Sequence, residues 1–468
     1  MTRRRSQRAG ITIAVLLAVL GLAAAGCGSP PPHALADTPS LDQQDGKACG
    51  AAANGPGLGA TQLQRAYQAQ AMFARGIDGA GTTIAVIIPS ADPAITADVR
   101  TYSSVYSLPV PDLHVIDWPG TPVASAGDPA AAAGAREGTL DLEMAHALAP
   151  GARLIYMEVP GGQGQAYSSA LAWLVTRQHV DVVSYSEGIP EPWAKSAGGS
   201  YRTLLSLRDG LQAAARAGVT VVAGTGDYGA TQPEDTDPGT LYPFPVALWP
   251  ASDPLAAAVG GTRLHTNASG NRVSADTAFA SIGGIAGGAG PSAVFARPSW
   301  QNSVRAVVGS RRGVADVSMD ASPCSPVFAY ASFSNPGGQR PGWADIFGTS
   351  VAAPLFAGIV ADAAQIAGHP LGVLGPALYR MYGPADGVMD VTEGTTTTPA
   401  LHGYAARPGY DLPTGIGTVG NALAFATALA RQAGGTPPGL AGHGRGPVAA
   451  VPLIPALARG SGVTGGRA

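Results

Sequence analysis

The sequence predicts an α/β fold in which helices cover both faces of a mainly parallel β-sheet. The first observation is a set of short, continuous apolar runs, a pattern typical of strands that are buried on both sides. The second is that helical stretches lie between these runs, as the crossover connections of a parallel sheet require. The apolar runs span residues 83–88, 153–159, 180–185, 219–223 and 256–259.

The size and composition of the chain fit a large globular domain. The chain has 468 residues, 46% of which are hydrophobic, so it can bury a sizeable core. A net charge of -3 and a charged fraction of only 13% exclude the basic surface that nucleic-acid binding needs. We therefore expect no nucleic-acid partner. We also expect the protein to be a monomer. The predicted helices span residues 62–75, 137–148, 168–177 and 201–217.

The two ends of the chain differ from the predicted domain. Four arginines within the first eight residues precede an uncharged apolar stretch at 11–25, which predicts that residues 1–26 are an export signal. Cys27 follows small residues in a pattern similar to a bacterial lipobox, so we expect a lipid on Cys27 that anchors the exported protein to the outer face of the cell membrane. The open alternative is cleavage near Ala25 and release by secretion.

The rest of the chain divides into a tether, a domain and a tail. Residues 27–58 are rich in Pro, Gly and Ala without periodicity, residues 59–432 form the predicted domain, and residues 433–468 are a low-complexity tail. If Cys27 is lipidated, Cys49 and Cys324 remain as an even pair in an oxidising compartment. They can form a disulfide only if the fold brings them together.

Two acids share one face of the predicted 137–148 helix. Glu137 and Asp141 are four residues apart, so their like charges oppose each other on the helix surface. A solvated acidic face is the plain alternative for such a pair. The helix is followed by APGA and then by a buried strand, which favours a functional role.

Two further segments carry polar groups that suit a reaction site. Asp227 follows the 219–223 strand, at the sheet edge where active sites of α/β folds gather, although an Asp between glycines also suits a simple turn. Ser350 begins a helical run of small residues, so its hydroxyl lies at a helix N-terminus that favours developing negative charge. A structural turn is the alternative for the GTS tripeptide.

Together these segments resemble the sedolisins, serine-carboxyl peptidases with a subtilisin-like fold, over residues 58–430. The matching motifs are Glu137-x-x-x-Asp141 with APGA, GTGDYGA with Thr225 in place of the usual Ser, and FGTSVAAP with Phe347 in place of Ser. The stretches VVSYSEGIPE, WPASDPLAAAVGGT, GGAGPSAVFARPSWQ and RRGVADVSMDAS also match.

The resemblance implies the hydrolysis of polypeptide substrates through an acyl-enzyme at acidic pH. It makes Ser350 the nucleophile and Glu137 the general base. It makes Asp141 the acid that orients Glu137, and Asp227 the residue of the oxyanion hole. The sequence does not fix the loop geometry that determines substrate preference. The choice between endopeptidase and tripeptidyl-peptidase action depends on the same loops.

The resemblance also implies one structural Ca²⁺ site near the C-terminal end of the domain. Two carboxylates and several backbone carbonyls form the hard oxygen ligand set that Ca²⁺ prefers. Arg407 stands where the family usually has Gly, which keeps a carbonyl but adds a bulky cation. The implied ligands are Asp390, Val391, Arg407, Gly409 and Asp411.

Two alternative functions remain at this stage. A subtilisin with a Ser-His-Asp triad needs a histidine at the start of the helix, where this chain has Glu137, and we expect His146 to be structural instead. The tether leaves no room for the long propeptide domain that the family usually carries. A catalytically silent, membrane-anchored binding protein on a peptidase fold is therefore the second alternative.

Overall fold

A computed structural model describes residue 49 and residues 57–433, apart from gaps at 90, 123, 126–127, 162–163, 196–198, 235–239 and 334–341. The predicted signal peptide, the predicted lipid site at Cys27 and the predicted tail lie outside the described residues, as does most of the predicted tether.

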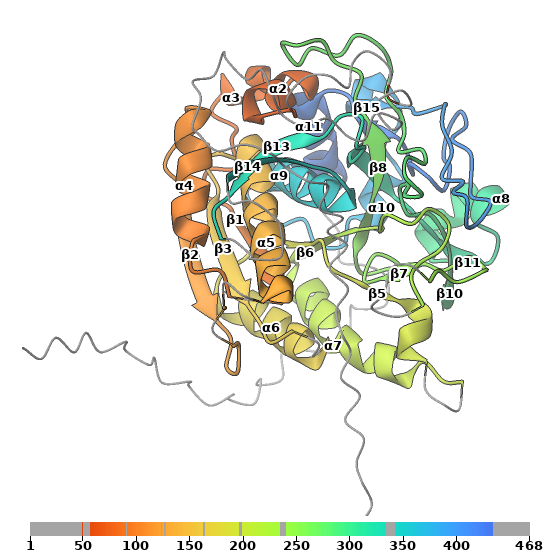
Figure 1. Ribbon diagram of the computed structural model, residues 1–468. Helices are drawn as coiled ribbons and strands as arrows, with labels where there is room; N and C mark the ends of the chain where they lie inside the picture. The colour runs from red at the N-terminus through yellow and green to blue at the C-terminus, as the bar shows by residue number, and fades with distance from the viewer. Residues whose placement is uncertain are drawn as a thin grey trace, which may run out of the picture.

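The central sheet has the strand order β15-β16-β12-β8-β6-β4-β1-β3-β2. Strands β8, β6, β1, β3 and β2 of this order are labelled in Figure 1. All neighbours along this path are parallel except β15 and β16, and the short β9 joins β8 in antiparallel fashion. The predicted mainly parallel sheet is confirmed. The bounds are β1 Thr83–Ile88, β2 Asp112–Asp117, β3 Arg153–Glu158, β4 Val182–Tyr185, β6 Thr220–Gly224, β8 Ala257–Arg263, β9 Thr277–Ala278, β12 Val317–Asp320, β15 Val388–Met389 and β16 Thr418–Val419.

In the described part of the chain, three two-stranded sheets lie outside the central sheet. Each of them is antiparallel. They pair β5 Ile189–Pro190 with β7 Leu248–Trp249, β10 Gly290–Ala296 with β11 Arg311–Val314, and β13 Val327–Ala331 with β14 Gly342–Ile346.

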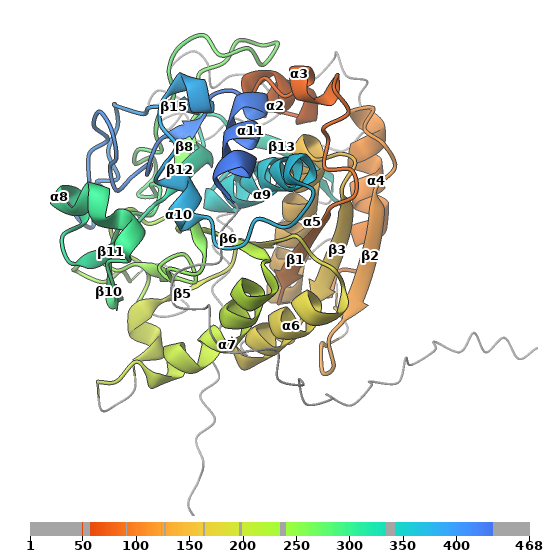
Figure 2. The same cartoon turned by 180° about the vertical axis from the view of Figure 1, so that it is seen from behind.

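Helices cover both faces of the sheet. This explains why the sequence of β1 is continuously apolar. Ile84, Val86 and Ile88 point into the core beneath α5 and α9, whereas Ala85 and Ile87 point into the second core beneath α6 and α7. In both views α6 and α7 lie together at the bottom (Figures 1 and 2). The α-helices are α2 Ala60–Ala66, α3 Gln70–Phe73, α4 Ile95–Val105, α5 Pro129–Leu148, α6 Gly164–Arg177, α7 Arg202–Ala217, α8 Arg305–Val308, α9 Thr349–Ala367, α10 Gly375–Leu378 and α11 Ala422–Gln432, and the 3₁₀-helices are η2 Glu191–Ala194, η3 Ser299–Val304 and η4 Pro384–Asp386.

The largest differences from the predicted helices are at α2, α3 and α5, and α6 also begins earlier than predicted, at Gly164. The single helix expected at 62–75 is divided into α2 and α3, because Gln68 adopts a left-handed backbone with φ of 57°. Helix α5 begins at Pro129 rather than at Glu137. Its first turns are almost entirely Ala, which has strong helix propensity but gives no apolar periodicity to read. Glu137 therefore lies in the middle of a helix.

Among the described residues, α9 is the one helix that is long and apolar enough to cross a membrane. It is 83% buried inside the protein. It contacts α5, α11 and the sheet strands β4, β6, β8 and β12. These contacts explain why the sequence of α9 is apolar: α9 is a core helix.

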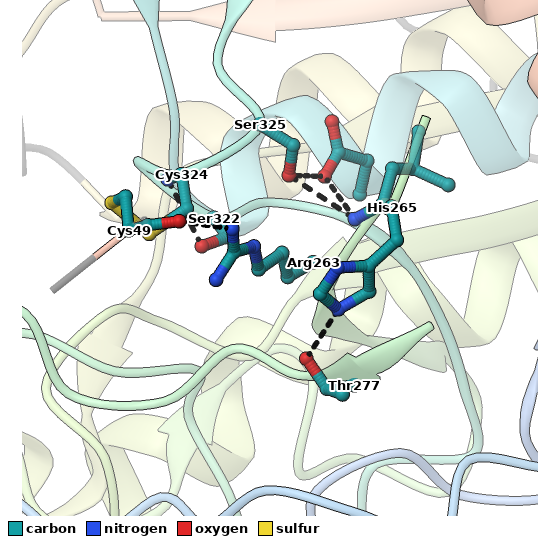
Figure 3. Close-up of a disulfide and its surroundings, with 9 residues drawn as sticks. Cys49, Arg263, His265, Thr277, Ser322, Cys324 and Ser325 are labelled. Carbon is teal, nitrogen blue, oxygen red and sulfur yellow. Dashed lines mark hydrogen bonds between the residues drawn. A yellow bond between two sulfur atoms is a disulfide. The ribbon is translucent and has the colours of Figure 1, made fainter. Parts of the chain in front are cut away.

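A disulfide joins Cys49 to Cys324, so the pairing that the sequence left open is present (Figure 3). The Cα atoms of the two cysteines are 5.2 Å apart. Arg263, at the end of β8, donates a hydrogen bond of 2.6 Å from Nη2 to the carbonyl oxygen of Cys49. The disulfide therefore fixes Cys49, which precedes the domain, to the loop after β12.

We expect the double variant Cys49→Ser/Cys324→Ser to lose about 2–5 kcal/mol of unfolding free energy. The disulfide closes a loop with a sequence separation of 275 residues, so removing it enlarges the unfolded ensemble. Denaturant unfolding with and without a reducing agent measures the loss. The reducing agent should destabilise the parent protein and leave the double variant unchanged; equal stability of the two proteins would contradict the prediction.

Candidate active site

Ser350 is the second residue of α9, and its position depends on Gly348. Gly348 precedes the helix with a φ of +119°, which favours glycine. A Cβ atom built on Gly348 would lie 2.6 Å from Oδ2 of Asp227. The glycine therefore allows the Asp227 carboxyl to lie directly against the N-terminus of the helix that carries Ser350.

Asp227 follows β6, at the carboxyl end of a central parallel strand, and is 8% exposed. Its Oδ1 accepts a hydrogen bond of 2.7 Å from the backbone N–H of Thr349. The Thr349 hydroxyl in turn accepts a hydrogen bond of 2.9 Å from the N–H of Gly226, which joins the loop to the helix. Burial raises the pKa of Asp227 to about 6, so this carboxyl keeps its proton in mildly acidic solution.

Ser186, in the loop after β4, connects α5 to α9. Its hydroxyl lies 2.6 Å from Oδ1 of Asp141 and 3.3 Å from the carbonyl oxygen of Ser350. That carbonyl lacks its usual partner within the helix, because the residue four positions later is Pro354, which has no N–H. Ser186 was not predicted as a site residue, although it directly follows the strand predicted at 180–185.

Glu137 and Asp141 are buried on the face of α5 that is turned toward Ser186 and Ser350. Burial raises the pKa of Glu137 to about 7; the hydroxyls of Ser350 and Ser186 act in the opposite direction, and Asp227 raises it further. Burial and the charge of Glu137 raise the pKa of Asp141 well above its usual value. The raised pKa of Asp141 favours its neutral carboxylic acid form, the form that is able to donate a hydrogen bond.

Glu137, Asp227 and Ser350 line one pocket, and Asp141 lies behind it through Ser186. None of the residues that line this pocket is a histidine. His146 is fully buried, and its Nε2 lies 3.0 Å from the carbonyl oxygen of Pro109. The group next to the serine hydroxyl is a carboxyl, so the arrangement suits proton transfer to a carboxylate and gives no support to a Ser-His-Asp triad.

The residues implied for Ca²⁺ lie on two loops that are in contact. Oδ2 of Asp390 accepts a hydrogen bond of 2.9 Å from the N–H of Gly409, and Oδ2 of Asp411 accepts one of 2.7 Å from the N–H of Arg407. Burial raises the pKa of Asp411 to about 6, and repulsion from Asp390 adds to this. No group of three or more His, Cys, Asp or Glu side chains that could hold a metal occurs in the described part of the chain, so backbone carbonyls would have to complete this site.

Comparison with known proteins gives consistent matches. Residues 114–370 match the model of the subtilase family. The chain is 33% identical to kumamolisin from Bacillus sp. (strain MN-32) over 367 residues, which cover 76% of this chain and 61% of kumamolisin. It is 29% identical to sedolisin from Pseudomonas sp. (strain 101) over 264 residues, which cover 55% of this chain and 42% of that relative. The chain thus spans less than two thirds of the length of either relative.

A solved structure has a fold similar to that of this chain. The structure of Pseudomonas sedolisin, a serine-carboxyl proteinase in complex with two molecules of pseudo-iodotyrostatin, superimposes with a TM-score of 0.66 at 27% sequence identity. The match covers 79% of this chain and 97% of that chain. The subtilisin-like α/β fold is therefore shared over nearly the whole of the solved chain.

Proposed function

Because the chain belongs to the sedolisin family of subtilisin-like serine-carboxyl peptidases, we propose that it hydrolyses peptide bonds of polypeptide substrates through an acyl-enzyme. One observation carries the proposal: the Ser350 hydroxyl, at the N-terminus of α9, shares a pocket with the buried carboxyls of Glu137 and Asp227. The solved relative is a serine-carboxyl proteinase, and the site of this chain has the groups that such a reaction needs.

In the proposed reaction Glu137 takes the proton of Ser350. The Ser350 hydroxyl is close enough to the Glu137 carboxyl to lower its pKa, which supports the transfer of the proton between them. The Ser350 oxygen then bonds to the carbonyl carbon of the substrate, and negative charge moves to the carbonyl oxygen. Protonated Asp227 donates a hydrogen bond to this oxyanion, a role that requires a neutral carboxylic acid.

The remaining steps return the proton and release the products. Glu137 passes its proton to the leaving amine as the peptide bond breaks, and the acyl group stays on Ser350. Water then loses a proton to Glu137 as its oxygen attacks the acyl carbon, and Ser350 recovers its proton when the acid leaves. Asp141, held by Ser186, acts as a positioning residue for Glu137 throughout.

The pH dependence tests this assignment of protons. Glu137, with a pKa of about 7, must be ionised, and Asp227, with a pKa of about 6, must be protonated. Activity is lost below these pKa values because Glu137 is protonated, and above them because Asp227 is ionised. We expect cleavage of an unstructured protein to follow a bell-shaped profile with its maximum on the acid side of neutrality. Cleavage that keeps rising above about pH 8 would contradict the assignment.

We also propose that this protein binds one structural Ca²⁺ ion between the loops of Asp390 and Asp411. The carboxyls of these residues, with the carbonyls of Val391, Arg407 and Gly409, form an all-oxygen ligand set. Asp411 is 3% exposed, and repulsion from the Asp390 carboxylate adds to the rise in its pKa. A divalent cation would remove this repulsion and hold the two loops together.

Removal of calcium is expected to lower the thermal unfolding midpoint by roughly 5 °C, because the ion binds only the folded loops. Differential scanning calorimetry with added Ca²⁺ and with a chelator measures the shift. In Asp390→Asn the shift should be much smaller, because one charged ligand is lost. A midpoint in the parent protein that does not respond to chelation would contradict the proposal.

The layout of the chain completes the proposal. We propose that residues 1–26 direct export, that residues 59–432 form the peptidase domain, and that a lipid on Cys27 holds the protein at the outer face of the membrane. The Cys49–Cys324 disulfide supports an exported protein, because such bonds persist in oxidising compartments. We further propose that the domain acts as a monomer.

A further inference from the structure

Glu187 is an acid of the pocket that the proposed reaction does not use. It follows Ser186 in the loop between β4 and β5 and lines the same pocket as Ser350. Glu187 is only 6% exposed, and its Oε2 has no hydrogen-bond partner. A buried carboxyl oxygen without a partner is unfavourable, so a ligand that supplies a donor here would be bound strongly.

The ionisable groups close to Glu187 are acids. Burial raises the pKa of Glu187 well above its usual value, and repulsion from Glu137 adds to this. Glu187 in turn raises the pKa of Asp141 and of the Tyr167 phenol, so acidic groups face it from α5 and α6. Asp227 contributes a fourth carboxyl to this part of the protein.

No cation of the described residues offsets these acids. The salt bridges of the described chain use other carboxylates, such as Asp253 and Asp316. Arg136 is next to Glu137 in the sequence. The pKa of Arg136 is lowered, and burial is the cause. An arginine paired with these acids would show the opposite shift. The pocket therefore lacks positive charge of its own.

The other walls of the pocket suit the stem of a basic side chain. Pro190, Tyr228, Pro233 and Leu248 are among the residues that line it. Lysine and arginine pack their methylene groups on such surfaces while the charged end contacts an acid. We propose that Glu187 determines specificity by selecting substrates with Lys or Arg close to the scissile bond. This inference rests on the proposed peptidase function.

The direct test compares pairs of peptides that differ only by Lys or norleucine at one position near the cleaved bond. We expect the parent protein to prefer the lysine peptide by roughly tenfold or more in kcat/KM at one of these positions, because a charged hydrogen bond is gained. In Glu187→Gln this ratio should fall to about twofold or less. The matched control is Glu143→Gln, a buried acid of α5 that accepts a hydrogen bond of 3.0 Å from the N–H of Tyr330; it should keep the ratio.

Two outcomes would overturn the inference. Equal cleavage of the lysine and norleucine peptides at every position by the parent protein would show that no cation is selected. A fall in the rates of both peptides by the same factor in Glu187→Gln would show that Glu187 acts through Glu137, as a positioning residue. Rescue of the preference by Glu187→Asp, but not by Gln, would support the role of the charge.

A binding measurement separates this inference from the proposed reaction. Fluorescent versions of the same peptides are titrated with the Ser350→Ala protein, and binding is followed by anisotropy. We expect tighter binding of the lysine peptide, with the difference lost in Ser350→Ala/Glu187→Gln. If the parent protein cleaves no peptide, the proposed function fails, but this measurement still decides whether the pocket selects a cation; equal binding of both peptides would reject it.

Discussion

Replacing Ser350 with alanine is expected to reduce peptide-bond cleavage by a factor on the order of 10³–10⁶. The substitution removes the hydroxyl that we propose as the nucleophile, which shares the pocket with Glu137 and Asp227. Removing it leaves the helix intact, since alanine is a strong helix former. The loss should appear in kcat rather than in KM, because the hydroxyl acts in the chemical step.

The control for this variant is Ser104→Ala, which changes an exposed serine near the end of α4. Both variants should unfold at the midpoint of the parent protein, while Ser104→Ala keeps full activity. Initial rates on a fluorogenic peptide, with unfolding followed by circular dichroism, give both quantities. Residual cleavage by Ser350→Ala within tenfold of the parent rate would contradict the role of the serine.

Glu137→Gln is expected to reduce cleavage by a factor on the order of 10²–10⁴, because the amide fills the same space but cannot take the proton of Ser350. The acid limb of the pH profile should also disappear, since ionisation of Glu137 defines it. The pKa of Glu137 is raised to about 7, so the parent protein should gain activity as the pH approaches this value from below. Rates from about pH 3 to about pH 8 test both effects.

Glu143→Gln is the matched control on the same helix. Glu143 is buried, as Glu137 is, but it does not line the pocket, and its Oε2 accepts a hydrogen bond from the N–H of Tyr330. An amide oxygen can accept the same bond, so this variant should retain the parent profile. A Glu137→Gln protein with the rate and the pH profile of the parent would show that another group takes the proton.

Much of the fold could be predicted because the central strands are buried on both faces. The five apolar runs correspond to β1, β3, β4, β6 and β8. Strand β2 was not predicted, because it is a sheet edge whose residues are mostly exposed. Strand β12 was also missed, since its burial includes Ser318 and Asp320, which interrupt the apolar pattern. A pattern of local hydrophobicity does not identify buried polar residues whose hydrogen-bond partners are distant in the sequence.

The candidate site was predicted only in part, for a similar reason. Glu137, Asp227 and Ser350 lie in local motifs, and the structure places all three around one pocket. Ser186 was missed because its importance depends on α9, where Pro354 leaves the Ser350 carbonyl without a partner. Glu187 was missed because only the fold shows that it is buried and faces the same pocket. Neither property is encoded within a few residues of its own position.

The central claim is that Ser350 forms a covalent bond to the acyl group of the substrate, and trapping that bond tests it most directly. The protein is mixed with a peptide p-nitrophenyl ester, quenched with acid and examined by intact and fragment mass spectrometry. We predict one acyl group per molecule, located on Ser350 and absent in Ser350→Ala. An acyl group on another residue, or rapid turnover of the ester with unmodified Ser350 in the quenched protein and an unchanged rate in Ser350→Ala, would contradict the account.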